Sequence, residues 1–138
     1  MLRLASSAEP SWLDLLPGVR VRVRPASVAM MLAAREAVGK VVRGDDREDV
    51  DLRTNIALVG ELARRAIVEW EGVGDADGVP IPVTPEHVDR LMEHWPAFDE
   101  FDTRYVGPAL RRDAEKNASS SSPNGTSEGA PITAAPAA

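Results

Sequence analysis

Two pairs of side chains in this sequence have the chemistry of metal ligands: His87 with His94, and Asp75 with Asp77. His87 and His94 are its only histidines, and their separation of seven residues places them on one face of a helix. Helical zinc pairs use i, i+4 spacing instead, and no nearby acid completes a tetrahedral set of ligands. Asp75 and Asp77 could belong to a calcium loop, but the early ligand of that pattern would fall on Val73. We therefore expect no metal ion and no cofactor.

A second candidate is a stripe of arginines. From Val19 to Arg24 valine and arginine alternate without a break, so Arg20, Arg22 and Arg24 share one face of a half-buried strand. This face is either an anion-binding stripe or the solvated side of the strand, where positive charge also discourages edge pairing. The net charge of -6 favours the solvated face and argues against a nucleic-acid partner, since phosphate binding relies on clustered Lys and Arg.

Catalytic motifs are missing from the sequence. It contains no phosphate-binding G-x-x-x-x-G-K-[ST] loop, no G-x-S-x-G nucleophile elbow and no H-E-x-x-H pair. There is no cysteine, which excludes a thiolate nucleophile and disulfides. A binding or assembly module needs only uncovered apolar grooves, which helical stripes can supply. We therefore expect a binding protein and not an enzyme.

Four helices are predicted to follow the strand, because apolar residues recur there with i, i+3, i+4 spacing. The first helix runs from Ser27 to Val42 and the second from Asp51 to Trp70. A short third helix runs from Pro85 to Trp95, and the fourth starts at Pro96 and continues to Glu115. Pro108 lies inside the fourth pattern and should kink or restart that helix, because proline deletes a backbone hydrogen bond.

The middle of the chain is predicted to turn sharply. Asp75-Ala76-Asp77-Gly78 is a strong turn signal, and the proline-containing stretch after it, Val79 to Val83, suits an edge strand or an extended arm. Thr84 should cap the helix that follows. Trp70 precedes the turn, where its ring can pack on the core while its indole N–H finds a partner.

These elements predict an α+β fold that is mainly α. A short N-terminal β-strand or hairpin is followed by a small bundle of four or so helices, with an extended arm in the middle. Residues 1–116 are expected to form a single domain, whereas residues 117–138 are rich in Ser, Pro, Gly and Ala and are expected to be disordered. No window of the sequence approaches a membrane span, so we expect no membrane partner and a cytoplasmic protein.

The segment from Ala66 to Thr84, AIVEWEGVGDADGVPIPVT, resembles a recurring signature of tailed-phage tail assembly chaperones. In that family a helix ends in an aromatic residue, an acidic-glycine turn and a short proline-containing arm follow, and another helix opens after Thr or Ser. The alternating N-terminal strand agrees in outline, as does a late aromatic helix that runs into DAEKN and a Ser, Pro, Gly tail. The likeness covers roughly residues 12–127, and its specific part is the central segment.

The resemblance implies a non-enzymatic protein of a phage, prophage or gene transfer agent, acting in the host cytoplasm. Members of the family bind the tape-measure protein, keep it soluble, help recruit major tail (tube) subunits, and are absent from the mature particle. Many also make a longer frameshifted product. The amino-acid sequence leaves open a structural virion component, such as a head-tail connector or tail terminator, and a small regulatory or nucleic-acid module that uses the arginine stripe.

A partner-binding surface is expected on apolar side chains that the core leaves uncovered. The two stripes from which it would come are Leu52 to Trp70 and Phe98 to Leu110. The expected contact residues are Ile67, Trp70, Trp95, Phe98, Phe101 and Tyr105.

Overall fold

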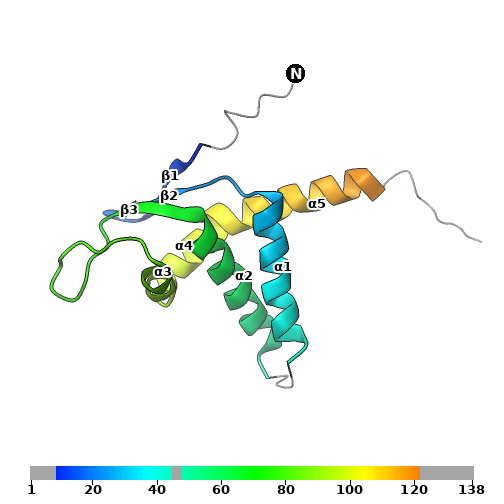
Figure 1. The fold of residues 1–138 in the computed structure, drawn as a ribbon, viewed down its shortest axis with the longest axis horizontal. Helices are drawn as coiled ribbons and strands as arrows, with labels where there is room; N and C mark the ends of the chain where they lie inside the picture. Colours follow the sequence, from blue (N-terminus) through cyan, green and yellow to red (C-terminus); the bar gives the residue numbers. More distant parts are fainter. Residues whose placement is uncertain (1–8, 45–47, 122–138) are drawn as a thin grey trace, which may run out of the picture. The chain divides into compact units, whose positions relative to one another are not determined.

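The structure is a computed structural model that describes residues 9–44 and 48–121 (Figure 1). The chain divides into two compact units, residues 1–106 and 107–138. The described part of the first unit contains β1 (Ser11–Leu16), β2 (Val19–Val23), α1 (Val28–Val42), α2 (Val50–Ala66), β3 (Ile67–Glu71), α3 (Pro85–Met92), α4 (Trp95–Phe101) and the π-helix η2 (Asp102–Val106). The described part of the second unit is the helix α5 (Gly107–Ser121). The predicted fold class, α+β with mostly helix, is confirmed. No described helix is long and apolar enough to cross a membrane.

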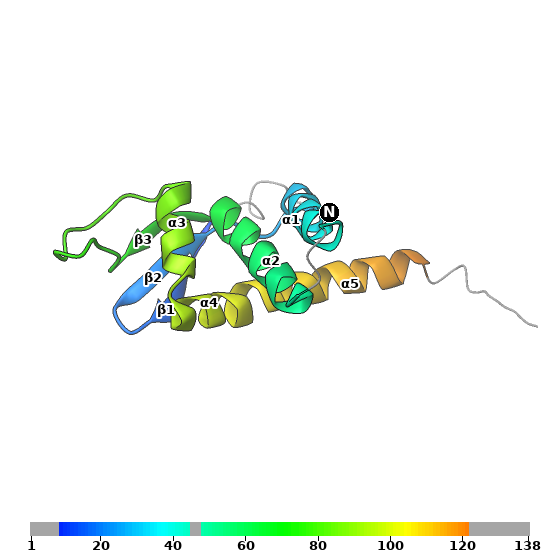
Figure 2. The ribbon, with the colours of Figure 1, turned by 90° about the horizontal axis from the view of Figure 1, so that it is seen from below.

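The sheet is antiparallel, with the strand order β1-β2-β3 (Figure 2). Of the two alternatives expected at the N-terminus, a strand or a hairpin, the structure has the hairpin: the valine-arginine alternation forms β2 as predicted, and Gly18 takes a φ of +78° in the turn before it. Alternation places Val21 and Val23 on the face that is buried, together with Leu15 and Ile67 from the neighbouring strands. The arginines therefore lie on the opposite face.

The third strand corrects the predicted second helix. That helix was expected to continue to Trp70, but α2 ends at Ala66 and the chain passes directly into β3. The spacing of Ile67 and Trp70 fits a helical stripe, yet the same residues pair with β2, where Trp70 lies opposite Val21. Cross-strand pairing decides the outcome here, because β-branched and aromatic side chains pack well on a pleated surface.

The arm predicted after Trp70 is a hydrogen-bonded loop that extends beyond the sheet in Figures 1 and 2. Gly72 begins it with a φ of +84°, and a Cβ atom there would clash with the carbonyl oxygen of Gly18. At the tip, Oδ1 of Asp75 accepts hydrogen bonds from the backbone amides of Asp77 and Val79, both at 2.9 Å. The turn prediction is confirmed in detail.

The indole of Trp70 secures the base of this arm. Its Nε1–H donates a hydrogen bond of 2.8 Å to the carbonyl oxygen of Ile81, as expected for a tryptophan whose polar edge needs a partner. Thr84 then caps α3, because its side-chain oxygen accepts a hydrogen bond from the amide of His87 at 3.1 Å. Strand β3, the arm and α3 are thus joined by specific hydrogen bonds.

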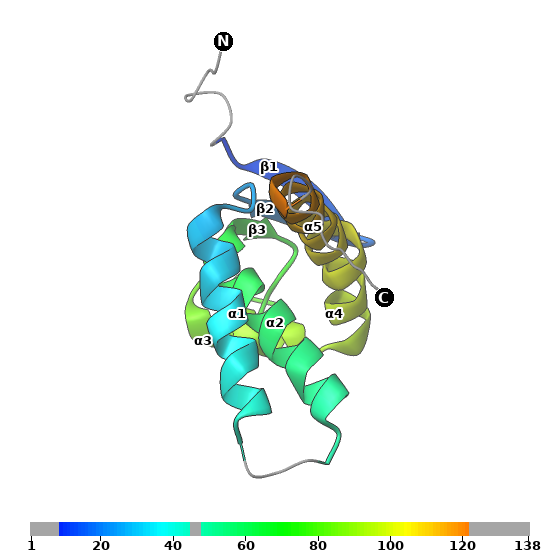
Figure 3. The ribbon, with the colours of Figure 1, turned by 90° about the vertical axis from the view of Figure 1, so that its right-hand side faces the viewer.

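Helices α1 and α2 pack side by side and form the bulk of the helical layer of the first unit (Figure 3). Ser27 caps α1 by accepting a hydrogen bond from the amide of Met30 at 3.2 Å. Apolar residues of both helices make up much of the core: Met30, Met31, Ala34, Val59, Leu62, Ala63 and Ala66.

The last two predicted helices are divided differently in the structure. The third ends at Met92 instead of Trp95, and the fourth is interrupted after Phe101 by the π-helix η2, before α5 begins at Gly107. A proline at position 108 cannot donate the backbone bond that an uninterrupted α-helix would need, so the predicted restart occurs at this point. The predicted domain boundary after residue 116 falls inside α5, and residues 122–138 of the expected tail lie outside the described residues.

Candidate partner-binding surface

The six expected contact residues differ widely in exposure. Trp95 is 55% exposed, whereas Trp70 is half-buried on the inner face of the sheet. The other four have exposed fractions of 9% or less and belong to the core: Ile67, Phe98, Phe101 and Tyr105. Three of these four, Ile67, Phe101 and Tyr105, line neither of the hollows described below, whereas Phe98 lines one of them. Trp95 is therefore the main accessible residue of the set.

Packing explains why the late aromatic stripe is covered. Phe101 is fully buried and stacks on Tyr105, with ring centroids 5.0 Å apart. The hydroxyl group of Tyr105 donates a hydrogen bond of 2.6 Å to the carbonyl oxygen of Arg24, just after β2. The stripe therefore joins α4 and η2 to the N-terminal sheet.

Trp95 owes its exposure to its position at the first residue of α4. His94 precedes it in extended conformation and Pro96 follows, so the helix begins here. The indole ring stacks on the buried ring of Phe98 with a centroid distance of 5.3 Å and an interplanar angle of 6°. One face of the tryptophan is thereby held in place, while more than half of the side chain stays open to solvent.

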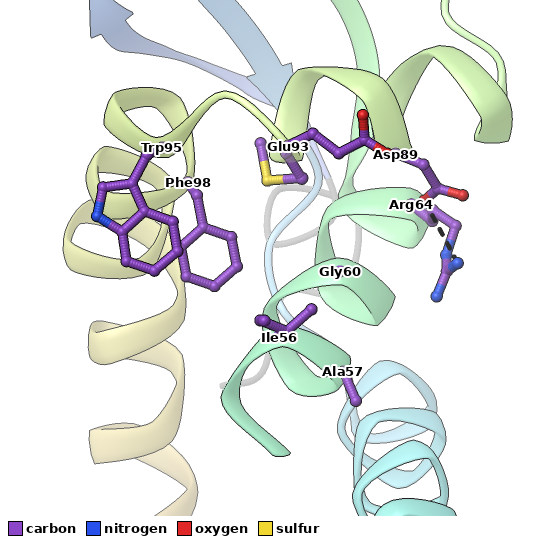
Figure 4. A pocket seen from close by; sticks show the side chains of 9 residues that line it. Ile56, Ala57, Gly60, Arg64, Asp89, Glu93, Trp95 and Phe98 are labelled. Carbon is purple, nitrogen blue, oxygen red and sulfur yellow. Dashed lines mark hydrogen bonds and ion pairs between the residues drawn. The ribbon is translucent and has the colours of Figure 1, made fainter. Parts of the chain in front are cut away.

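A hollow of about 500 Å³ opens beside Trp95 among α2, α3 and α4 (Figure 4). We call it the α2–α3–α4 hollow. Ile56, which is 46% exposed, faces it from α2, and the missing side chain of Gly60 leaves room on the same helix. The lining residues are Ile56, Ala57, Gly60, Arg64, Asp89, Met92, Glu93, Trp95 and Phe98.

A second hollow, of about 750 Å³, is also lined by Trp95. We call it the β1–α4 hollow, because the end of β1, the turn after it and α4 form its walls. Its lining residues are Asp14, Leu15, Leu16, Pro17, Gly18, Trp95, Pro96, Asp99, Glu100 and Arg104. Trp95 is common to both hollows, so a ligand in either one would contact the indole ring.

Ion pairs tie the walls of the α2–α3–α4 hollow together. The guanidinium group of Arg64 lies 3.3 Å from a carboxylate oxygen of Asp89 on α3 and 3.2 Å from one of Glu61 on its own helix. These side chains are partly exposed, so the pairs contribute orientation more than stability. Glu93, at the end of α3, adds a carboxylate to the rim.

Two arginines of the stripe on the outer face of the sheet form ion pairs with glutamates of β3. Arg20 forms a bidentate pair with Glu71 at 2.7 and 3.1 Å, and Arg22 lies 3.2 Å from Glu69. The guanidinium group of Arg20 also stacks over the ring of Trp12, with 4.2 Å between its central carbon and the ring centroid. Because β3 supplies a carboxylate opposite each of these two arginines, the stripe is a neutralised face and not an open anion site.

Hydrogen bonding between Arg20 and Glu71 also changes their acid-base behaviour. It lowers the pKa of the Glu71 carboxyl group below its usual value, with the charge of Arg20 as a further cause. The same hydrogen bond raises the pKa of Arg20. Both groups therefore stay charged around neutral pH. The third arginine, Arg24, donates to the carbonyl oxygen of Arg65 at 3.3 Å.

Two of the four candidate metal-binding side chains, those of His87 and Asp75, form local hydrogen bonds. Nδ1 of His87 lies 2.6 Å from the carbonyl oxygen of Pro82, so this nitrogen carries the hydrogen and donates it. One carboxylate oxygen of Asp75 is engaged in the turn described above. Among the described residues, no group of three or more His, Cys, Asp or Glu side chains is placed to hold a metal ion.

Sequence reasoning included Trp95 but missed its setting. Ile56 lies within the Leu52 to Trp70 stripe but is not among the six expected contact residues, and the sequence does not connect Glu93 or Asp99 with the aromatic residues. The available signal was the start of a helix at Trp95-Pro96, which leaves a first-turn side chain at the edge of the packed layer. Comparison of the chain with protein-family models, curated proteins and solved structures finds no match.

Proposed function

We propose that this protein is a non-enzymatic tail assembly chaperone of a phage or phage-derived particle, which binds the tape-measure protein and keeps it soluble. The observation that carries the proposal is the exposed indole of Trp95, which lines two hollows. Exposed tryptophans in such settings commonly anchor protein partners. The resemblance of the central segment to the chaperone family supplies the identity of the partner.

The α2–α3–α4 hollow suits the helical surface of a long tape-measure protein. Its apolar lining comes from Ile56, Met92, Trp95 and Phe98, while charged groups lie around it. An amphipathic helix can bury its apolar side chains in such a groove and leave its polar side in water. Covering that stripe would keep a long helical protein from associating with itself before assembly.

Co-expression with the tape-measure protein tests the proposal. We expect the long protein to become soluble and to co-purify with the wild-type chain. Trp95→Asp should abolish both effects, because it places a charge at the centre of the contact. Leu32→Asp is a matched control: Leu32, on α1, is also 55% exposed but lines neither hollow, so this variant should retain both effects.

Two results would overturn the proposal. One is a tape-measure protein that stays insoluble while this chain assembles alone into rings, which would indicate a head-tail connector or tail terminator. The other is stoichiometric incorporation of the chain into mature particles. A loss of binding caused by Leu32→Asp and not by Trp95→Asp would move the contact surface to α1.

A further inference from the structure

The surface formed by the two hollows that Trp95 lines carries an excess of negative charge. The two hollows together are lined by five carboxylates and two guanidinium groups, and one of the five acids, Asp14, lies opposite Arg20 in the sheet. Arg64 is matched with Asp89, and Arg104 with Glu100 at 2.7 Å. Within the described part of the chain, neither Glu93 nor Asp99 has an ion-pair partner. These two acids belong to different hollows, with Trp95 lining both.

The walls of the α2–α3–α4 hollow also restrict the backbone of an occupant. All of its lining residues come from helices or from the end of α3, so it offers no strand edge to which an extended peptide could add. A chain seated there must satisfy its own backbone hydrogen bonds, and a helix does this without help from the groove.

We propose that the occupant of this surface is a basic amphipathic helix. Its apolar side chains pack against Trp95 and enter the α2–α3–α4 hollow, and Lys or Arg side chains flanking that apolar stripe face Glu93 in this hollow and Asp99 in the β1–α4 hollow. The inference rests on the proposed function in one respect: it describes the segment of the tape-measure protein that binds here. Complementary charge raises the association rate and selects against acidic partners. The same negative charge opposes binding of nucleic acid or an anionic membrane.

Two fluorescein-labelled synthetic peptides serve as probes. Each has about 18 residues, enough for a marginally stable isolated helix, and both carry the same leucine stripe at i, i+3, i+4, i+7. One has lysine and the other glutamate at the flanking positions. Measured by fluorescence anisotropy with the full-length protein at low salt, the lysine peptide should bind at least about tenfold more tightly. This preference should shrink at about 1 M salt, where the screening length falls to about 3 Å.

Charge-reversal variants test whether Glu93 and Asp99 cause the preference for the lysine peptide. In Glu93→Lys/Asp99→Lys the preference should fall to about equal affinity or reverse, because the acids that face the flanking residues are replaced by cations. The control is Glu9→Lys/Asp77→Lys, which changes the net charge by the same amount at exposed acids that line neither hollow. It should keep most of the preference. Trp95→Ala should weaken binding of both peptides.

Equal affinity of the wild-type protein for the two peptides, or no binding of either, would overturn the inference. So would an equal effect of the test and control variants, since that would reflect net charge and not this surface. A different result would contradict the proposed function alone. If the lysine peptide binds as expected but the tape-measure protein neither binds nor becomes soluble, the surface does bind basic helices, and the chaperone assignment is wrong. If the tape-measure protein co-purifies equally well with Glu93→Lys/Asp99→Lys, the charge inference fails and the chaperone assignment stands.

Discussion

The outer face of the sheet and the surface around Trp95 each place a tryptophan among charged side chains. On the sheet, Trp12 lies beneath Arg20, and Arg20 is paired with Glu71. Around Trp95 the balance is different, because Glu93 and Asp99 lack ion-pair partners within the described residues and the indole is more than half exposed.

This difference shows which of the two surfaces, the outer sheet face or the surroundings of Trp95, offers a partner more favourable binding free energy. A cross-strand pair such as Arg22 with Glu69 already has its counter-charge, so a partner that binds there must first displace it. At Trp95 the apolar surface is uncovered, and two of the neighbouring acids, Glu93 and Asp99, have no ion-pair partner among the described residues that a partner would have to displace. The arginine stripe stands out in the sequence, but it contributes to the sheet, and the less obvious surface is the better binding candidate.

The largest expected effect comes from breaking the sheet face. Gly72→Ala should destabilise the protein by about 3 kcal/mol or more, since the new Cβ would meet the carbonyl of Gly18 at a positive φ. Gly78→Ala is the matched control, because Gly78 has a φ of +79° but open space around its Cβ, and it should cost only about 1–2 kcal/mol. Urea denaturation measures both. Equal losses would show that the approach to Gly18 is relaxed in solution.

The next effect separates the two tryptophans. Trp95→Ala should reduce affinity for the tape-measure protein more than about tenfold, with a stability loss of about 1 kcal/mol because the side chain is already half exposed. Trp12→Ala removes the ring beneath Arg20 and should leave affinity unchanged. Isothermal titration calorimetry and thermal unfolding compare the two variants. Loss of affinity in Trp12→Ala would place the sheet face in the interface.

The smallest expected effect is a change of folding stability with pH, caused by the pair of Arg20 and Glu71 on the sheet face. Arg20 holds the pKa of Glu71 low in the folded protein, so this group stabilises the fold fully above the pKa of an unfolded-state glutamate, about 4.3. The contribution should disappear as the pH falls through the lower folded-state pKa. The difference in urea midpoint between wild type and Glu71→Gln should therefore shrink on acidification. A difference that grows in acid would contradict the pairing, and NMR titration should show the Glu71 pKa rising in Arg20→Gln.

Sequence patterns correctly predicted the elements that are determined by residues close together in the chain. The alternation from Val19 to Arg24, the turn at Asp75 and the cap at Thr84 depend on neighbours in the sequence, and all three are confirmed. The end of α2 was predicted wrongly, because Ile67 and Trp70 satisfy helical spacing as well as strand pairing. Only the partner strand decides between these alternatives.

The sequence predicted that uncovered apolar side chains would form the candidate site, but it did not predict which of these side chains are uncovered. Helical spacing identifies the apolar face of a segment, but it does not tell whether another element covers that face. Phe101 and Tyr105 are covered by packing within α4 and η2 and by the hydrogen bond to Arg24. Ile56 and Trp95 belong to similar patterns and are left open. That distinction depends on the tertiary arrangement of α2, α3 and α4.

Pairing of β3 with β2 has a consequence for the folding kinetics. The hairpin of β1 and β2 closes through a short turn, whereas Arg20 and Glu71 pair across a separation of 51 residues. Bringing β3 to the sheet therefore costs more loop-closure entropy, unless α1 and α2 form first and draw the ends of that loop together. We expect β3 to join late, and the fluorescence of Trp70, which changes surroundings at this step, should report it in a stopped-flow experiment on a variant in which Trp12 and Trp95 are replaced by phenylalanine.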